Sequence, residues 1–229
     1  MDSITTGPVA DLLPRLFREA EASDSALVEE WSDSASREDS ISQLLAAEGR
    51  DYKGLYHRFA EHYLSVSPEF GRFVYMCARA GGARTVVEFG TSFGISTIHL
   101  AAAVRDNGGG RVVSTEVEPG KAERARENLA AAGLADLVDI RVGDAVETLR
   151  EDVGDQIDLV LLDGAFTLYR PVLELLEPKL RAGALVLGEN TTEQAPEYLD
   201  HVRDPGNGYL GLSVPINHER GNHVAVRTR

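Results

Sequence analysis

The chain has one cysteine in 229 residues, no long apolar run and fewer basic than acidic side chains. A single cysteine, Cys77, excludes an internal disulfide framework and a cysteine-rich zinc site, and its apolar helical spacing places it in the core. No run approaches the roughly 20 apolar residues that a membrane span needs. Residues 1–24 lack a basic segment and an uninterrupted apolar segment. We therefore expect no signal peptide and a cytoplasmic location.

Acidic side chains outnumber basic ones by 37 to 23, which gives a formal net charge of −14. Such a charge disfavours binding to the phosphates of nucleic acid and to anionic membranes. We expect neither as a partner, and a small neutral or cationic ligand fits the charge better. The same acidity would also keep an ordinary protein in solution, so the charge alone does not separate these two interpretations.

The order of apolar periods predicts the fold class. From residue 85 onward, strand and helix periodicities alternate, which predicts a doubly wound, mostly parallel α/β sheet with helices on both faces. The expected strands are residues 85–89, 111–116, 138–142, 157–162 and 184–188, and the expected helices are about 95–105, 120–132 and 168–180. Two extended runs at 209–215 and 223–228, joined by a short polar loop, predict an antiparallel hairpin at one sheet edge.

The residues before the sheet are predicted to be helical, and the length of the chain favours a single domain. One buried helix face is predicted from the spacing of five side chains, namely Val9, Leu12, Leu13, Leu16 and Phe17. An acidic, serine-rich stretch at residues 23–42 holds the only tryptophan, Trp31, so we expect it to pack against the rest of the protein. A further helix is predicted to begin at Ser67-Pro68-Glu69 and to end at Gly81-Gly82.

Residues 85–100, TVVEFGTSFGISTIHL, predict a strand, a glycine turn and a helix. In a parallel sheet such a turn brings backbone N–H groups and a helix N-terminus to a ligand, and Gly90 and Gly94 leave the approach open. A turn without any ligand would carry the same pattern. A dinucleotide-binding loop matches poorly, because Ser92 stands where its second glycine would be.

Two further interpretations of this turn predict different functions, namely catalysis by a serine nucleophile and binding of a cofactor. The segment Gly90 to Gly94 fits the G-x-S-x-G nucleophile elbow of serine hydrolases, with Ser92 as nucleophile and Asp163 and His218 following in the chain. Alternatively, Glu88 before the turn indicates a loop that binds S-adenosylmethionine (SAM). The elbow normally follows several strands of the same sheet, whereas everything before residue 85 is predicted to be helical. The hydrolase is therefore disfavoured.

Acidic side chains follow the predicted strands at the edge where open α/β sheets bind ligands. These positions are Glu88, Glu116, Asp144 beside Gly143, Asp163, and Glu189 with Asn190. Glu116 ends the second strand, where a carboxylate can accept hydrogen bonds from both hydroxyls of a ribose. Asp144 could accept a hydrogen bond from an exocyclic amine such as that of adenine, or cap the helix that starts near Ala145. Together these residues predict a nucleotide-like ligand.

Five segments carry a family resemblance: VVEFGTSFGIST, STEVEPGKAERARENLAAAGL, VGDA, DLVLLDGAFTLY and LGEN. In order and spacing they resemble class I SAM-dependent O-methyltransferases of the catechol and caffeoyl-CoA type. The resemblance covers about residues 65–229 and implies a seven-stranded, Rossmann-like methyltransferase domain at 66–229. Residues 1–65 would then form a helical extension, expected to cap the acceptor site or to form a dimer surface. The implied activity is methyl transfer from SAM to a hydroxyl of a small molecule.

The resemblance also implies site residues. Those that would contact SAM are Glu88, Gly90, Thr91, Ser92, Ser96, Glu116, Gly143, Asp144, Ala145 and Asp163. A divalent metal, Mg²⁺ by preference, would be held by Asp163, Glu189 and Asn190, with Asp163 also catalytic. Two positions depart from the family pattern. Phe166 stands where the family often has a lysine base, and Glu189 is one methylene longer than the usual aspartate.

The missing lysine leaves the catalytic base open. A vicinal diol or phenol that chelates a metal could react without it, whereas sugar-like hydroxyls would need a protein base such as His201, His218 or His223. Phe166 also favours a second function, that of a protein that binds SAM or a nucleoside without transferring a methyl group. The acceptor itself cannot be identified from the sequence.

Overall fold

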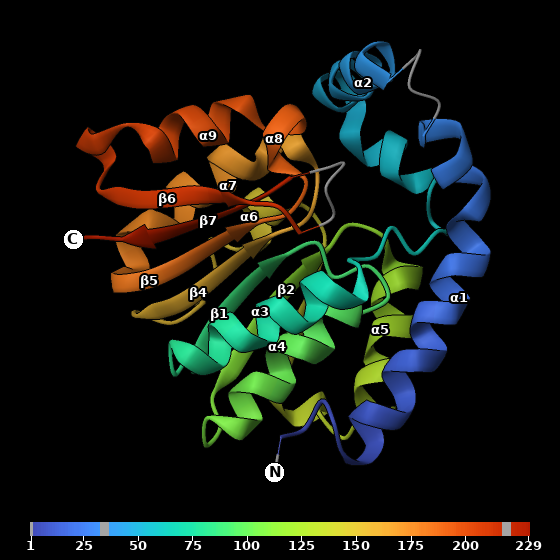
Figure 1. Ribbon diagram of the computed structural model, residues 1–229, viewed down its shortest axis with the longest axis vertical. Helices are drawn as coiled ribbons and strands as arrows, with labels where there is room; N and C mark the ends of the chain where they lie inside the picture. Colours follow the sequence, from blue (N-terminus) through green and yellow to red (C-terminus); the bar gives the residue numbers. More distant parts are fainter. Residues whose placement is uncertain (1, 33–36, 217–220) are drawn as a thin grey trace.

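A computed structural model describes residues 2–32, 37–216 and 221–229, with only the backbone described for 28–32, 37–40 and 192–193. Its centre is a seven-stranded sheet with the order β3-β2-β1-β4-β5-β7-β6 (Figure 1). The strands are β1 (Thr85–Phe89), β2 (Arg111–Glu116), β3 (Val138–Val142), β4 (Ile157–Leu162), β5 (Leu180–Gly188), β6 (Tyr209–Val214) and β7 (Asn222–Arg227). Strands β1 to β5 are parallel, and β7 runs antiparallel to both of its neighbours. The predicted doubly wound sheet and C-terminal hairpin are confirmed.

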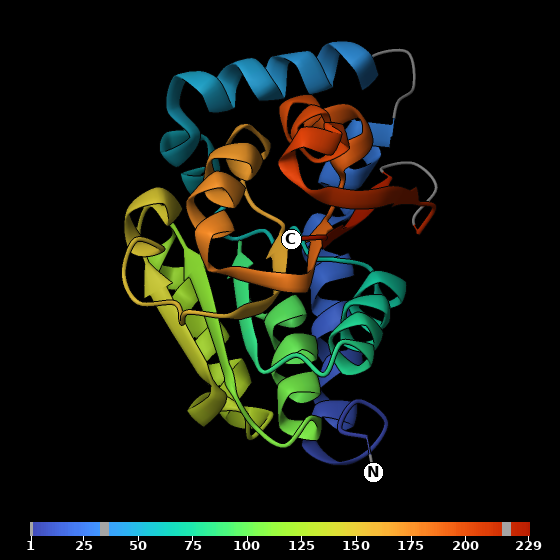
Figure 2. The same cartoon turned by 90° about the vertical axis from the view of Figure 1, so that its left-hand side faces the viewer.

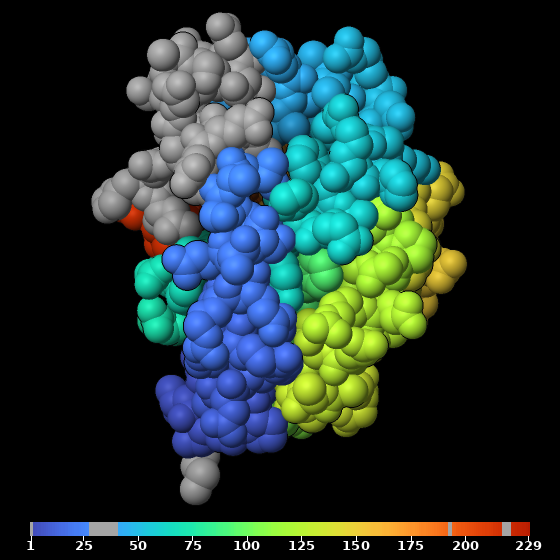
Figure 3. Space-filling model, turned by 90° about the vertical axis from the view of Figure 1, so that its right-hand side faces the viewer, coloured from blue at the N-terminus to red at the C-terminus, as the bar shows by residue number. Residues whose placement is uncertain are grey.

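Helices cover both faces of the sheet. One face packs against α1 (Gly7–Ser32), α3 (Pro68–Ala80), α4 (Ile95–Asp106) and α5 (Pro119–Ala131), and the other against α6 (Ala145–Thr148), α7 (Tyr169–Leu176) and α9 (Pro196–Arg203). Successive strand residues alternate between these two cores, as Val86 and Val87 do, because side chains on a strand point to opposite faces. Helix α1 lies on the outside, beside α5 (Figure 3).

The observed boundaries of β1 to β4 agree with the predicted ones, whereas those around α7 differ from the prediction. The predicted helix at 168–180 is divided into a 3₁₀ turn η2 (Phe166–Leu168), α7, and a second 3₁₀ turn η3 (Glu177–Lys179). Pro178 has no N–H with which to continue the α-helical hydrogen bonding. Strand β5 begins at Leu180, four residues earlier than predicted, and its register against β4 is irregular between Ile157 and Leu159.

The N-terminal residues form two long helices. Val9, Leu12, Leu13 and Leu16 are buried on α1 as predicted, with Phe17 packed at their edge. The predicted α3 is capped by the Ser67 hydroxyl, which accepts a hydrogen bond from the Phe70 N–H, and by Gly81. Cys77 packs at the rim of the core and is only partly buried.

Helix α2 (Arg37–His57), which the sequence did not single out, lies across the carboxyl ends of the strands (Figures 1 and 2). The expected packing of Trp31 falls on a side chain outside the described ones. The division at residue 65 and a dimer surface on residues 1–65 stay predictions. No described helix combines the length and the apolar character that crossing a membrane requires.

Candidate functional site

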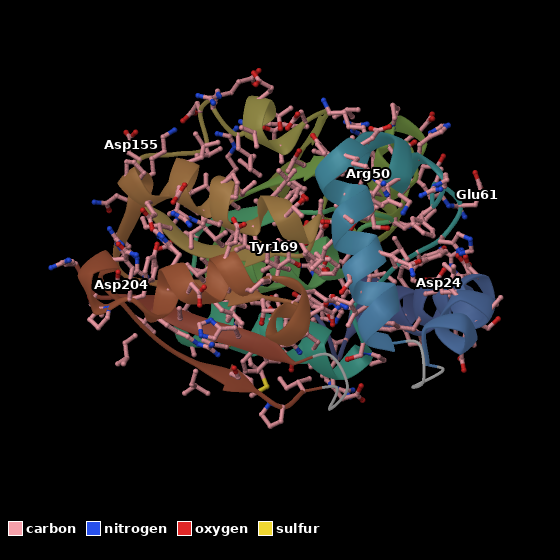
Figure 4. All side chains as sticks on the ribbon, turned by 90° about the horizontal axis from the view of Figure 1, so that it is seen from above. Asp24, Arg50, Glu61, Asp155, Tyr169 and Asp204 are labelled. Atoms are coloured by element: carbon pink, nitrogen blue, oxygen red, sulfur yellow. The ribbon has the colours of Figure 1, made fainter. Side chains whose placement is uncertain are left out.

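A cavity of about 260 Å³ lies between the carboxyl edge of the sheet and α2. Most of the predicted site residues line it, namely Gly90, Thr91, Ser92, Ser96, Glu116, Gly143, Ala145, Asp163, Glu189 and Asn190. The N-terminal helices supply the opposite wall, including Asp24, Tyr52 and Tyr56. Figure 4 shows the molecule from above, with α2 marked by Arg50 and with Tyr169 near the middle of the molecule. The fold thus brings the residues of five strand ends into one cavity.

Glu116 is fixed by backbone donors at the end of β2. One carboxylate oxygen accepts a hydrogen bond from the Ser92 N–H at 2.6 Å, and the other accepts from the Glu118 N–H at 3.0 Å. Burial raises the pKa of Glu116, while these N–H groups and the ammonium of Lys121 oppose that rise. The Val117 N–H is a third backbone donor to this carboxylate. Because a carboxylate can accept about four hydrogen bonds, Glu116 keeps acceptor capacity for a donor in the cavity. Two neighbouring hydroxyls of a ribose are donors of this kind.

The glycine turn after β1 is packed against other loops as well as facing the cavity. Gly90 has φ +101°, and a Cβ built on it would lie 2.1 Å from the Asp163 carbonyl oxygen. The expectation that Gly90 is bare only to admit a ligand is therefore incomplete, because the neighbouring backbone already requires a glycine. Ser92, with φ +45°, donates its hydroxyl hydrogen bond to the Tyr63 carbonyl oxygen. This contact ties the turn to the segment that joins α2 and α3.

Glu88 lies behind the turn and is fully buried. One of its oxygens accepts hydrogen bonds from the hydroxyls of Thr97 and Ser114, each at 2.5 Å. The Ser114 hydroxyl also lies 2.5 Å from that of Thr91, which faces the cavity. Burial raises the pKa of Glu88, and the hydroxyl donors oppose the rise. Glu88 is outside the cavity wall, so it supports the turn from behind, and its direct contact with a ligand stays a prediction.

Asp144 also lies outside the cavity wall, between two residues that form part of it. One carboxylate oxygen accepts a hydrogen bond from the Val146 N–H at 3.0 Å, which caps α6 as one of the two sequence interpretations predicted. The other oxygen lies 3.0 Å from the ammonium of Lys53 on α2. Contact of Asp144 with an adenine amine stays a prediction.

Asp163, Glu189 and Asn190 follow the adjacent strands β4 and β5 and line the cavity, as Phe166 does. Asn190 adopts a left-handed backbone, and its N–H donates to the Asn222 side-chain oxygen at 3.0 Å. The Asn190 Oδ1 atom is buried and has no hydrogen-bond partner. A buried oxygen of this kind suits a hard cation, since such ions take carboxylate and amide oxygens as ligands. The residues present therefore fit a divalent metal.

Across the described ranges, no three histidine, cysteine, aspartate or glutamate side chains cluster closely enough to hold a metal ion. A metal at this edge would accordingly depend on Asn190 as well as on the two acids. Two of the predicted histidine bases lie away from the cavity. His201 pairs with Glu177 at 2.7 Å, and burial lowers the pKa of His223 to about 4. His218 lies outside the described residues.

Comparisons with known proteins agree with this geometry. Residues 87–191 match the family model of a methyltransferase domain. The chain is 33% identical over 168 residues to the catechol O-methyltransferase of Niastella koreensis, and the match covers 67% of this chain and 73% of the relative. The chain belongs to the catechol O-methyltransferase-like family of SAM-dependent O-methyltransferases.

Two further relatives support this assignment. The catechol O-methyltransferase of Mycobacterium tuberculosis is 39% identical over 127 residues, which cover 56% of this chain. The match spans only 57% of the length of that relative. The crystal structure of cofactor-bound Rv0187 from MTB aligns with a TM-score of 0.68 at 28% identity, over 90% of this chain and 98% of that one. Family membership removes the serine hydrolase alternative, in agreement with the engagement of the Ser92 hydroxyl by Tyr63.

Several cavity residues were not predicted from the sequence. Tyr63 stacks on Phe93 with ring centroids 4.2 Å apart, and the ammonium of Lys121 lies 5.5 Å from the centre of the Phe93 ring. Burial lowers the pKa of Lys121. Tyr52 and Tyr56, four residues apart on α2, were detectable as an aromatic pair on one helix face, but only the fold places that face over the cavity.

Proposed function

We propose that this protein transfers a methyl group from SAM to a hydroxyl of a small-molecule acceptor. The observation that carries the proposal is the single cavity in which Glu116 and the glycine turn lie with Asp163, Glu189 and Asn190. In this arrangement Glu116 would hold the ribose of SAM, and Asp163 would lie toward the methionine end and the acceptor. The family membership and the cofactor-bound relative support the same assignment.

Methyl transfer depends mainly on the alignment of the reacting atoms. Methyl transfer is an in-line displacement, so the acceptor oxygen, the methyl carbon and the sulfur must lie on one line in a site from which water is excluded. The turn after β1 is fixed by the contacts of Ser92 with Glu116 and Tyr63, so it offers a rigid surface to the cofactor. We further propose that residues 1–65 act as the cap of this site, because Tyr52 and Tyr56 of α2 form part of the cavity wall opposite the sheet edge.

We propose that Asp163, Glu189 and Asn190 hold a divalent cation, with Mg²⁺ the first choice. When bound, such an ion would fix the angle of the acceptor hydroxyl and lower its pKa. The buried, unpartnered Oδ1 atom of Asn190 supports this assignment. A catechol, whose two adjacent oxygens can chelate a metal, is the acceptor class that fits best, as the names of the two relatives also suggest.

The test combines binding and turnover on the full-length protein. Calorimetry with SAM is expected to give binding, and incubation with catechol, SAM and Mg²⁺ is expected to give a methylated product. Exhaustive chelation should stop methylation and leave SAM binding almost unchanged, and Asn190→Ala should have the same effect. SAM binding without methylation of any phenol or diol would favour the binding protein that Phe166 suggests. Full activity after chelation would contradict the metal assignment alone.

A further inference from the structure

Helix α2 carries a buried acid with unusual surroundings. Glu48 is 2% exposed, and its two carboxylate oxygens accept hydrogen bonds from the Tyr56 hydroxyl at 2.8 Å and from the Thr167 N–H at 3.0 Å. Both donors are neutral, and no basic side chain of the described residues pairs with Glu48. A buried carboxylate without a cationic partner is costly to the fold, so its presence calls for a role.

Tyr56 separates this acid from the cavity. Its side chain lines the cavity wall together with Asp163 and Phe166, whereas Glu48 lies behind the wall. Burial, and then the neighbouring carboxylate of Glu48, raise the pKa of Tyr56 well above its ordinary value. The phenol therefore stays protonated and donates a hydrogen bond to Glu48. A lone pair of the phenol oxygen is then left to accept a hydrogen bond from a second donor.

The reaction needs a destination for one proton. An acceptor hydroxyl loses its proton as its oxygen attacks the methyl carbon, and Phe166 leaves no lysine ammonium or amine at that point of the wall. His201 and His223 do not line the cavity. Asp163 and Glu189 would be engaged by a metal under the proposed function, on which this inference rests. Lys121 also lines the cavity, but its ammonium lies beside the Phe93 ring and interacts with Glu116, in the half of the site assigned to the cofactor. Tyr56, with Glu48 behind it, is therefore the group that we assign to pass a proton out of the acceptor half of the cavity.

We propose that Tyr56 is a catalytic residue that accepts the proton of the acceptor hydroxyl, and that Glu48 is the positioning residue that takes the tyrosine's own proton in the same step. The acceptor O–H bond breaks as its proton moves to the Tyr56 oxygen, and the phenolic proton moves to Glu48. The acceptor's electron pair forms the new C–O bond, and the C–S bond breaks with its pair left on sulfur. After product leaves, the proton returns from Glu48 through the Tyr56 hydroxyl to water in the open cavity.

Other charged groups surround this pair and act in one direction. Glu116 at the end of β2 and Asp163 after β4 both disfavour a negative charge on the phenol, as Glu48 does. Tyr169 of α7 is subject to the same group of acids, which includes Glu48 and Glu189. A tyrosinate is thus disfavoured by the neighbouring acids, so the phenol can relay a proton only while another proton leaves it. This explains why the hydroxyl must be in contact with Glu48.

The test compares Tyr56→Phe and Glu48→Gln with the wild-type protein in single-turnover transfer from SAM to catechol, with Mg²⁺ present. A proton-accepting group contributes about 100- to 10,000-fold, so each variant should lose at least about 100-fold in rate near pH 7. SAM affinity should change by less than about twofold. The deficit should shrink as the pH rises through the pKa of the metal-bound acceptor, which lies below the value of about 10 for a free phenol, because an acceptor that is already ionised needs no proton acceptor.

A matched control comes from α3. The Tyr75 hydroxyl donates to Asp106 at 2.7 Å, which is the same type of contact far from the cavity, so Tyr75→Phe should lose stability without losing rate. Wild-type rates in both variants would overturn the inference and leave the proposed function standing. An equal deficit at every pH would also overturn it, because a structural defect does not depend on ionisation of the acceptor. No methylation of catechol or of any other phenol or diol by the wild-type protein would refute the proposed function, and this inference with it.

Discussion

Removing the Glu116 carboxylate tests the cofactor half of the site most directly. In Glu116→Ala, the two hydrogen bonds offered to a ribose diol are lost, and the Ser92 and Glu118 N–H groups lose their acceptor. Hydrogen bonds to a charged group contribute about 1.5–3 kcal/mol, and the ribose hydroxyls can partly regain water as partners. We therefore expect a total loss of about 1.5–3 kcal/mol in SAM binding, or roughly a 10- to 150-fold rise in Kd.

The assay is calorimetric titration of SAM, with urea unfolding to confirm that the variant is folded. Glu123→Ala is the matched control, since it removes the same charge from an exposed position on α5, five residues after Glu118. The control should bind SAM like the wild-type protein, which would show that the loss in Glu116→Ala is not a general effect of net charge. Unchanged SAM affinity in folded Glu116→Ala would refute the assignment of Glu116 to the ribose.

Three other predictions follow from the structure. Gly90→Ala should lower the unfolding free energy by about 1–3 kcal/mol and weaken SAM binding, because its Cβ meets the Asp163 carbonyl. Gly109→Ala is the control, since Gly109 has a similar φ of +94° but no neighbour within 4 Å of an added Cβ. Equal losses of stability for the two variants in urea unfolding would contradict this prediction. Asn190→Ala should abolish stimulation by Mg²⁺ with SAM affinity retained, measured by titrating the metal into the transfer assay. Burial lowers the pKa of His99 to about 4, so as the pH falls below 6.5 the unfolded state binds a proton before the folded state does. The unfolding free energy should therefore fall by up to about 1.4 kcal/mol per pH unit down to pH 4. His99→Gln should reduce this dependence of the unfolding free energy on pH, measured by urea unfolding.

The sheet was predictable because its local signals agree with its tertiary environment. Strands β1 to β4 occupy the predicted residues, since each is rich in β-branched residues or leucine and is bounded by glycine, polar or charged residues. The parallel arrangement then places their carboxyl ends, and the acids that follow, at one edge. The cofactor half of the candidate site, centred on Glu116 and Gly90, follows from these two facts.

Helix α2 was not predictable in the same way. Its short central apolar run, residues 44–47, is flanked by polar and charged residues, and no continuous apolar face reveals which side is buried. Glu48, for example, looks like a solvated residue in the sequence and becomes buried only because the Thr167 N–H and the Tyr56 hydroxyl converge on it. For Asp144 the sequence allowed both a ligand contact and a helix cap, and the structure shows the cap of α6 together with the contact to Lys53 of α2. The contacts of Glu48 with Thr167 and of Asp144 with Lys53 join segments that are distant in the sequence, so local patterns could not predict them.

Helix α2 touches the loops that follow three different strands. His57 lies 3.1 Å from Glu118 after β2, Lys53 lies 3.0 Å from Asp144 after β3, and Glu48 accepts a hydrogen bond from Thr167 after β4. The strand-end loops and α2 therefore enclose one cavity from two sides. We expect substitutions at the cavity-lining residues of α2, such as Ile41, Leu44 and Tyr52, to change acceptor preference while the strand-end residues stay as they are. A library of variants confined to these positions is accordingly a direct route to new acceptors on an unchanged sheet.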